Sequence, residues 1–150
     1  MHRVLFICHG NICRSTMAES VMTELVRRAG RENEFVIDSA ATSREEIGNP
    51  PHRGTVNKLR EVGIPVVPHR ARQIRAEELN RWDVIAYMDE ENLRGLRRIF
   101  GAAQLEAARR DGRIMPLLAD RDVADPWYTG DFDATYRNVL TGCTELLERL

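Results

Sequence analysis

Two residues near the N-terminus, Cys8 and Arg14, have the types and the spacing needed to hold and attack a tetrahedral anion. The loop between them is short and polar, and its Gly10 and Asn11 tolerate unusual backbone angles. A loop that leads into a helix exposes unpaired backbone N–H groups, and the helix dipole adds partial positive charge there. A thiol in this setting loses its proton easily, and a guanidinium grips two oxygens of a phosphate. Cys8 is therefore the candidate nucleophile, and Arg14 is the candidate oxyanion-binding residue.

The same spacing separates Cys143 from Arg149, so spacing alone is weak support. Two glutamates and no glycine lie between those residues, and the segment is typical of a helix whose carboxylates would repel an oxyanion. We therefore interpret Cys143 as an ordinary buried thiol. Cys8 differs in its context, because the buried-type strand 4–7 precedes it and a helix pattern begins at Ser15.

Phosphoryl transfer from an ester also needs a proton donor for the leaving oxygen. Asp125 is the best candidate, because Pro126 fixes the backbone that follows it. The next residues, Trp127 and Tyr128, can line the mouth of a pocket for a flat leaving group. Other acids nearby lack such a setting; they are Asp120, Asp122, Asp131 and Asp133.

The whole chain has the composition of an ordinary globular protein, with 150 residues, 43% hydrophobic and 30% charged, which suits a single domain over 1–150. Its net charge of -1 gives no global attraction for nucleic acid or an anionic membrane. No segment has the pattern of a signal peptide or a membrane span. Three cysteines do not make a secreted disulfide framework, so we expect a cytoplasmic location.

A metal site is not expected. Cys8, His9 and Cys13 lie close together in the sequence, but no second cluster of ligands accompanies them, and the other histidines are scattered.

Strands and helices alternate along the chain. Buried-type strands are expected at 4–7, 34–38, 83–88 and 113–118. Helices are expected at 15–29, 52–62, 89–100, 102–109 and 132–150, with a single turn at 75–79 and loops at 39–51, 69–74 and 120–131. In 52–62 we expect Val56, Leu59 and Val62 to face inward. In 132–150 the expected inward residues are Phe132, Tyr136, Leu140, Cys143, Leu147 and Leu150. This alternation predicts an α/β fold with a parallel sheet covered by helices on both faces and a ligand site at the carboxyl ends of the strands.

Four segments together resemble the low-molecular-weight protein tyrosine phosphatase family over essentially the whole chain. They are C-H-G-N-I-C-R-S from residue 8, D-S-A from residue 38, M-D-E-E-N-L from residue 88 and D-P-W-Y from residue 125. The resemblance implies a three-layer fold with a four-stranded parallel sheet, no cofactor, and hydrolysis of phosphotyrosine and aryl phosphates. It further implies that Cys8 attacks phosphorus to form a phosphocysteine, and that Arg14 and the loop amides hold the equatorial oxygens. Asp125 would protonate the phenolate and then activate the water that releases phosphate.

The resemblance also implies a phosphate-binding loop and supporting contacts. The loop comprises His9, Gly10, Asn11, Ile12, Cys13, Arg14 and Ser15. Asn11 would take a strained backbone held by hydrogen bonds to Ser39 and His69, while the Ser15 hydroxyl would stabilise the thiolate. Cys13 is either a small side chain packed under the loop or the partner of Cys8 in a reversible, protective disulfide.

Asp89 and Asn92 are interpreted as structural, since they suit the N-terminal cap of a helix.

The chain departs from the family in residues that affect substrate choice. His9 stands where the family often has an apolar residue, and Arg44-Glu45-Glu46 occupies a region where many members carry an aromatic. We therefore expect a substrate rim of His9, Ile12, Trp127 and Tyr128, with the last two making most of the ring contact.

Three alternative functions are considered, and one sequence feature argues against each. A protein-arginine phosphatase of the same fold typically has threonine at the position of Ile12, and an apolar Ile12 suits a phenyl ring better than a guanidinium. An arsenate reductase would relay a disulfide through a pair of cysteines in mid-chain, and none lies between Cys13 and Cys143. A phosphocarrier module is shorter and lacks the Arg14 and Asp125 pair. The expected partners are phosphotyrosine-containing proteins, not nucleic acid or membrane, and the chain is expected to be a monomer or a weak homodimer.

Overall fold

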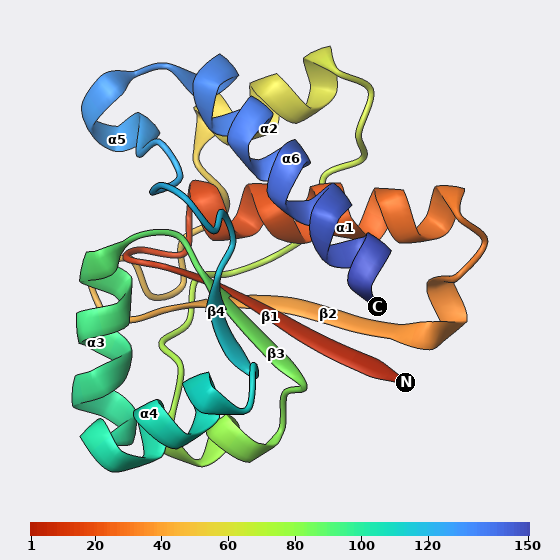
Figure 1. Ribbon diagram of the computed structural model, residues 1–150. Helices are drawn as coiled ribbons and strands as arrows, with labels where there is room; N and C mark the ends of the chain where they lie inside the picture. Colours follow the sequence, from red (N-terminus) through yellow and green to blue (C-terminus); the bar gives the residue numbers. More distant parts are fainter.

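The computed structural model describes residues 1–150 and contains one parallel sheet between two layers of helices (Figure 1). The sheet order is β2-β1-β3-β4, where β1 is His2–Cys8, β2 is Phe35–Ala41, β3 is Val84–Tyr87 and β4 is Ile114–Pro116. The helices are α1 (Arg14–Arg28), α2 (Arg53–Glu61), α3 (Glu90–Phe100), α4 (Ala102–Arg110), α5 (Pro126–Thr129) and α6 (Phe132–Arg149), with 3-10 turns η1 (Glu32–Glu34) and η2 (Ala76–Asn80). The predicted three-layer α/β fold with four parallel strands is confirmed.

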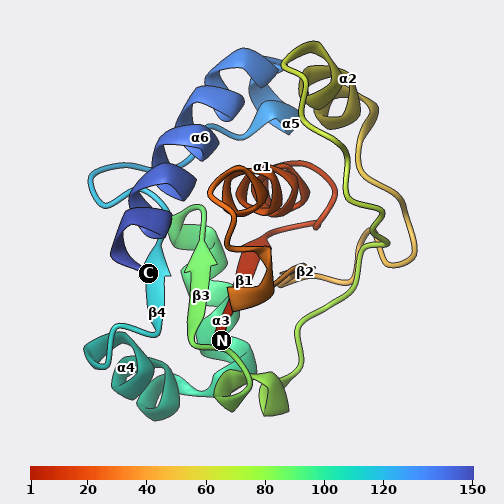
Figure 2. The same cartoon turned by 90° about the vertical axis from the view of Figure 1, so that its right-hand side faces the viewer.

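Alternating side chains of β1 belong to two separate cores. Val4 and Phe6 join the cluster that includes residues of α1 and α6, while Leu5 and Ile7 join the cluster that includes residues of α3 and α4. All four side chains are fully buried, which explains why the strand reads as a continuous apolar run. Figure 2 shows α1, α2 and α6 on one side of the sheet and α4 on the other.

The strand order creates a crevice at the carboxyl end of β1. The chain passes from β1 to β2 on one side and later returns to β3 on the other side of β1. At this edge the connections from neighbouring parallel strands leave in opposite directions and separate. Ligands bind at such a point in open α/β sheets. The loop between β1 and α1 emerges at this point.

The second strand is longer than predicted. We expected a strand at 34–38 and a loop from Ser39, but β2 continues to Ala41, which lies opposite Cys8 in the register of the sheet. Ser39, Ala40 and Ala41 are small residues with little intrinsic preference for strands, so pairing with β1 decides their conformation.

The predicted loop 120–131 contains the short helix α5, which the sequence analysis missed. Asp125 caps this helix by accepting a hydrogen bond from the Trp127 N–H at 3.0 Å, Pro126 occupies the first turn, and Gly130 ends the helix with a φ of 70°. Proline at a helix start and glycine just after its end are favourable at these positions. Asp125 is therefore held at a defined helix terminus.

In two helices the buried stripe is shifted from the predicted one, although Leu59 of α2 and Cys143 of α6 are buried as predicted. In α2, Thr55 and Leu59 are buried, whereas Val56 is only partly buried. In α6 the fully buried residues are Thr135, Val139, Gly142, Cys143 and Leu146, and the other five residues predicted to face inward border this stripe as partly buried side chains. The rotation brings Gly142 against Leu117, where a Cβ would collide with the Leu117 side chain. No helix is both long and apolar enough to cross a membrane.

Candidate active site

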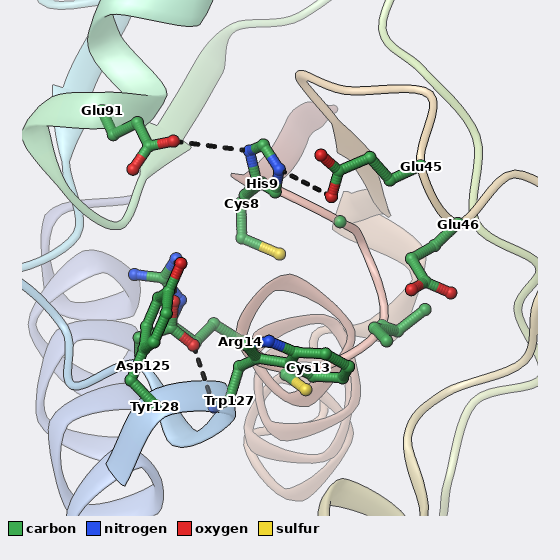
Figure 3. Close-up of a pocket in the computed structure, with 12 residues that line it drawn as sticks. Cys8, His9, Cys13, Arg14, Glu45, Glu46, Glu91, Asp125, Trp127 and Tyr128 are labelled. Atoms are coloured by element: carbon green, nitrogen blue, oxygen red, sulfur yellow. Dashed lines mark hydrogen bonds and ion pairs between the residues drawn. The ribbon is translucent and has the colours of Figure 1, made fainter.

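A cavity of about 320 Å³ opens at the carboxyl end of β1 (Figure 3). Its walls come from the loop after β1, the loop after β2, the start of α3, and α5. The lining residues are Cys8, His9, Gly10, Ile12, Cys13, Arg14, Glu45, Glu46, Glu91, Asp125, Trp127 and Tyr128. The topology thus brings Cys8 and Asp125, which lie at opposite ends of the chain, into one pocket.

The Cys8 thiol points into this pocket and has two polar neighbours. Its Sγ accepts a hydrogen bond from the Asn11 backbone N–H at 3.3 Å and lies 3.0 Å from Ser15 Oγ. No side chain caps the N-terminus of α1, so the first N–H groups of that helix remain available at the same place. Such N–H groups can bind an oxyanion beside the sulfur.

Asn11 gives the loop its shape. Its φ of 61° lies in the left-handed region, and it is the one residue other than glycine with a positive φ. The side-chain amide donates to Ser15 Oγ at 2.8 Å and to Ser39 Oγ at 3.0 Å. Its carbonyl oxygen accepts from His69 Nε2 at 2.6 Å and from the Arg72 N–H at 3.1 Å. Four hydrogen bonds to a fully buried side chain hold a backbone conformation that would otherwise be costly.

Glu19 of α1 supports this network and was missed by the sequence analysis. Its Oε1 accepts a hydrogen bond from Ser39 Oγ at 2.6 Å and lies 3.4 Å from His69 Nδ1. Burial raises the pKa of Glu19 to about 7. A helix pattern gives no sign that a glutamate at this position faces inward, because the buried polar network exists only once β2 and the loop at 69–74 have assembled.

Glu19, Asp38 and His69 are also the candidate metal ligands of the molecule, with ligand atoms within 4.8 Å of one another. From the sequence, Cys8, His9 and Cys13 were weighed as ligands and His69 was set aside as scattered, so this cluster was not foreseen. Asp38 pairs with the Arg72 guanidinium at 3.0 Å, and a fixed cation beside the cluster disfavours a metal ion. We therefore assign these residues to the support of Asn11.

Arg14 is almost fully buried and is held by three oxygens. Its Nη1 lies 2.7 Å from Asp89 Oδ2 and donates to the Val123 carbonyl at 3.2 Å, and its Nη2 lies 3.3 Å from Asp125 Oδ2. Burial lowers the pKa of Arg14, but Cys8, Asp89 and Asp125 together raise it above its ordinary value, so the guanidinium stays charged.

Asp89 has a second task that the sequence analysis did not foresee. It caps α3, as expected, because its Oδ1 accepts from the Asn92 N–H at 2.8 Å. Its other oxygen, however, orients Arg14 at 2.7 Å. The capping role could be predicted from the sequence of the helix start. The contact with Arg14 could not, because it depends on β1 and β3 being neighbours in the sheet.

The structure separates Asp125 from its rivals. Asp125 lines the pocket, whereas none of the four alternative acids does. Asp131 caps α6, Asp133 pairs with Lys58, and Asp120 pairs with Arg121 at 3.1 Å. Asp122 is exposed on the neighbouring loop surface.

One edge of the pocket mouth is a row of polar contacts centred on His9. His9 Nε2 lies 3.0 Å from Glu45 Oε2, and His9 Nδ1 lies 3.7 Å from Glu91 Oε1, so the imidazole bridges two carboxylates (Figure 3). Glu45, Glu46 and Glu91 were not predicted to line the site. This rim is acidic and would repel an anion, whereas the depth of the pocket holds the Arg14 guanidinium and the free N–H groups of the loop.

The other predicted rim residues also line the mouth. Trp127 is 63% exposed and Tyr128 is 83% exposed, so both offer free ring surface at the entrance. Ile12 and Gly10 form the loop side of the mouth.

Cys13 is buried beneath the loop, and its pKa is raised to about 12 by burial and by the charges of Cys8 and Asp125. It therefore stays a protonated thiol at neutral pH, and in that form it is a poor nucleophile.

Comparison with known proteins agrees with this geometry. Residues 3–150 match the family model described as low molecular weight phosphotyrosine protein phosphatase. The low molecular weight protein-tyrosine-phosphatase YfkJ of Bacillus subtilis is 40% identical over 98% of this chain and 94% of its own length, and the human low molecular weight phosphotyrosine protein phosphatase is 38% identical over 97% and 94%.

Solved structures show the same fold. The crystal structure of YfkJ has a TM-score of 0.88 over 99% of this chain and 94% of the other, at 39% identity. That of SP-PTP, the low molecular weight protein tyrosine phosphatase from Streptococcus pyogenes, has a TM-score of 0.85 over 100% and 93%, at 38% identity. With a family match over nearly the whole length and relatives at this identity, the chain belongs to the low molecular weight phosphotyrosine protein phosphatase family.

Proposed function

We propose that this chain hydrolyses phosphotyrosine in proteins, and simple aryl phosphates, through a phosphocysteine formed at Cys8. The observation that carries the proposal is the arrangement of a thiol, a buried guanidinium and a carboxylic acid in one pocket. Cys8 Sγ receives the Asn11 N–H, while Arg14 lies 3.3 Å from Asp125 on the opposite wall. Relatives named as protein tyrosine phosphatases at about 40% identity support the same reaction.

In the first step, Cys8 Sγ attacks phosphorus and the bond from phosphorus to the phenolic oxygen breaks. Arg14 and the N–H groups at the start of α1 hold the non-bridging oxygens, where negative charge is greatest. The protonated form of Asp125 donates its proton to the departing oxygen, so that tyrosine leaves as a neutral phenol rather than as a phenolate.

In the second step, water attacks the phosphocysteine. The Asp125 carboxylate takes a proton from that water, the bond from sulfur to phosphorus breaks, and phosphate leaves as the thiolate of Cys8 re-forms. Ser15 Oγ, at 3.0 Å from Cys8 Sγ, stabilises the departing thiolate. The reaction uses no cofactor or metal ion.

Four residues support this chemistry without entering it. Asn11 holds the loop in its left-handed turn, and Ser39 and His69 anchor Asn11 by hydrogen bonds at 3.0 Å and 2.6 Å. Cys13 fills the space under the loop and can pair with Cys8 when the nucleophile is oxidised.

The pocket favours an aromatic leaving group. Trp127, Tyr128 and Ile12 all line it, and both aromatic side chains are largely exposed. A planar phenyl ring is buried well by such walls, whereas a guanidinium there would lose hydrogen bonds to water and gain no partner from Ile12.

Matched peptides test this preference. We expect a phosphotyrosine peptide to exceed a phosphoarginine peptide of the same sequence by at least about tenfold in kcat/KM. In Ile12→Thr the ratio should shrink, because the hydroxyl offers an acceptor to a guanidinium. A clear advantage for phosphoarginine in the unaltered protein would refute the assignment of substrate while leaving the phosphocysteine chemistry intact.

A cytoplasmic location accords with this chemistry, because a reducing compartment keeps the Cys8 and Cys13 thiols free. We further propose that the chain acts as a monomer or a weak homodimer on phosphotyrosine-containing proteins, and not on nucleic acid or membranes.

A further inference from the structure

Asp125 is paired with Arg14 at 3.3 Å, but the residues that follow it, 126–131, make no hydrogen bond to the rest of the molecule. Every hydrogen bond made by residues 126–131 ends within residues 125–135. On the N-terminal side the chain is anchored, because the Ala124 N–H donates to Asn138 Oδ1 at 2.9 Å and its carbonyl accepts from Thr135 Oγ1 at 2.9 Å. The position of α5 on the C-terminal side therefore depends on side-chain packing.

A single side chain, His52, packs against both ends of this segment. Its ring meets Trp127 edge-on, with centroids 6.1 Å apart and an angle of 81° between the ring planes. It also stacks on Phe132, with centroids 5.4 Å apart and an angle of 21°. Trp127 lies in α5 and Phe132 begins α6, so the imidazole bridges the short connection between these two helices. Figures 1 and 2 both show the beginning of α6 next to α2, with α5 on the chain just before it.

His52 is itself fixed to the phosphate-binding loop. Its backbone N–H donates to the Ile12 carbonyl at 2.7 Å. Three residues later, Thr55 Oγ1 donates to the Cys13 carbonyl at 3.2 Å, so the start of α2 is attached to the loop twice.

The ring is also oriented from its own helix. As the N-terminal cap of α2, His52 accepts the Gly54 N–H at Nδ1 over 2.9 Å, which restricts the rotation of the imidazole. The Phe132 ring lies directly over Gly54, where any Cβ would collide with it. The close approach of α2 and the start of α6 therefore requires glycine at position 54 beneath the Phe132 ring.

We propose that His52 is a positioning residue for the general acid. It acts through Trp127, whose backbone N–H donates to Asp125 Oδ1 at 3.0 Å. In this way His52 fixes the position of the Asp125 carboxyl group relative to the phosphate-binding loop. The inference rests on the proposed function, because it assigns His52 a role only if Asp125 donates the proton. Displacement of α5 would weaken proton donation but leave the oxyanion contacts of Arg14 and the loop amides in place.

A weakened proton donation can be detected by comparing substrates whose leaving groups differ in their need for the proton. With a poor leaving group, such as phenol, departure depends on the proton, whereas 4-nitrophenol leaves readily without it. The kcat/KM value reports the first chemical step. We therefore use the ratio of kcat/KM for 4-nitrophenyl phosphate to kcat/KM for phenyl phosphate, which rises when proton donation by the acid is impaired. A general loss of folding lowers both values alike.

Three variants make the test. His52→Asn keeps an N-cap acceptor but removes the ring, and we expect kcat/KM for phenyl phosphate to fall about tenfold while that for 4-nitrophenyl phosphate falls less than about twofold. His52→Phe keeps a ring and should restore the ratio to within about threefold, with a lower Tm from the lost cap. His2→Asn is the matched control, because His2 also contacts a phenylalanine, Phe35, but at the far end of β1. It should leave the ratio unchanged.

A double-mutant cycle gives an independent measurement. Trp127→Ala should raise this kcat/KM ratio. Adding His52→Asn should raise it little further, because both substitutions remove the same contact between the His52 and Trp127 rings. Equal losses on both substrates, a His52→Phe variant as defective as His52→Asn, or additive effects in the cycle would each overturn the inference. Failure of the proposed function is distinguishable, since it would show as an absent leaving-group effect in Asp125→Asn itself.

Discussion

Replacing Cys8 by serine is expected to lower kcat/KM for aryl phosphates by at least about a thousandfold, because a serine hydroxyl in this pocket has no base to activate it. The substitution changes one buried atom, and the neighbouring Asn11 N–H and Ser15 Oγ can still bind an oxygen there. The variant should therefore fold and still bind phosphate. Steady-state kinetics and thermal melting of the same preparation check both parts.

Cys143→Ala is the matched control for Cys8→Ser. Cys143 is the other fully buried thiol followed after five residues by an arginine, but it lies in α6 against the core and donates to the Ala18 carbonyl at 3.7 Å. Its loss should reduce stability and leave kcat/KM unchanged. Turnover retained in Cys8→Ser at the level of Cys143→Ala would eliminate Cys8 as the nucleophile.

Asp125→Asn is expected to lower kcat/KM for phenyl phosphate by about a hundredfold or more, because it removes the transferable proton. Asparagine still accepts the Trp127 N–H, so the cap of α5 persists and the change is confined to the proton. For 4-nitrophenyl phosphate the loss should be smaller, since that phenol departs without assistance. A series of aryl phosphates, plotted against the leaving-group pKa, should show a steeper dependence in the variant.

Asp122→Asn is the control, because Asp122 lies three residues away on the same loop but is exposed and outside the pocket. It should leave the leaving-group dependence unchanged. If Asp122→Asn produced the steep dependence while Asp125→Asn did not, the acid would have to be reassigned.

The fold was predictable because its signals are local. The apolar run before Cys8, the start of α1 and the spacing of the other strands each follow from a few neighbouring residues, and the parallel arrangement follows from their alternation. The end of β2 was missed, since Ser39 to Ala41 become a strand only by pairing with β1. α5 was missed because four residues are too few for helical periodicity.

The candidate site divides in the same way. Cys8, Arg14 and Asp125 were identified from residue type and immediate context, and the structure brings them into one pocket. Asp89 was recognised only as a helix cap, because its contact with Arg14 spans 75 positions in sequence. Glu19 escaped notice for the same reason.

The rim illustrates this limit most clearly. His9 lies between Glu45 and Glu91, which belong to the loop after β2 and to α3. No pattern within one segment indicates a polar contact among three segments. Residues that act through tertiary neighbours therefore require the assembled sheet, whereas residues that act through their own loop do not.

The central claim is that phosphate passes through Cys8, and rapid-quench mass spectrometry tests it most directly. Asp125→Asn should be mixed with excess 4-nitrophenyl phosphate, because the good leaving group allows the first step while the loss of the base slows the second. We predict one phosphoryl group per chain, on the peptide that contains Cys8, in Asp125→Asn and in its combination with Cys143→Ala, but not in Cys8→Ser. Turnover without any phosphoryl group on Cys8, or with the group on His9 or Ser15, would contradict the phosphocysteine pathway.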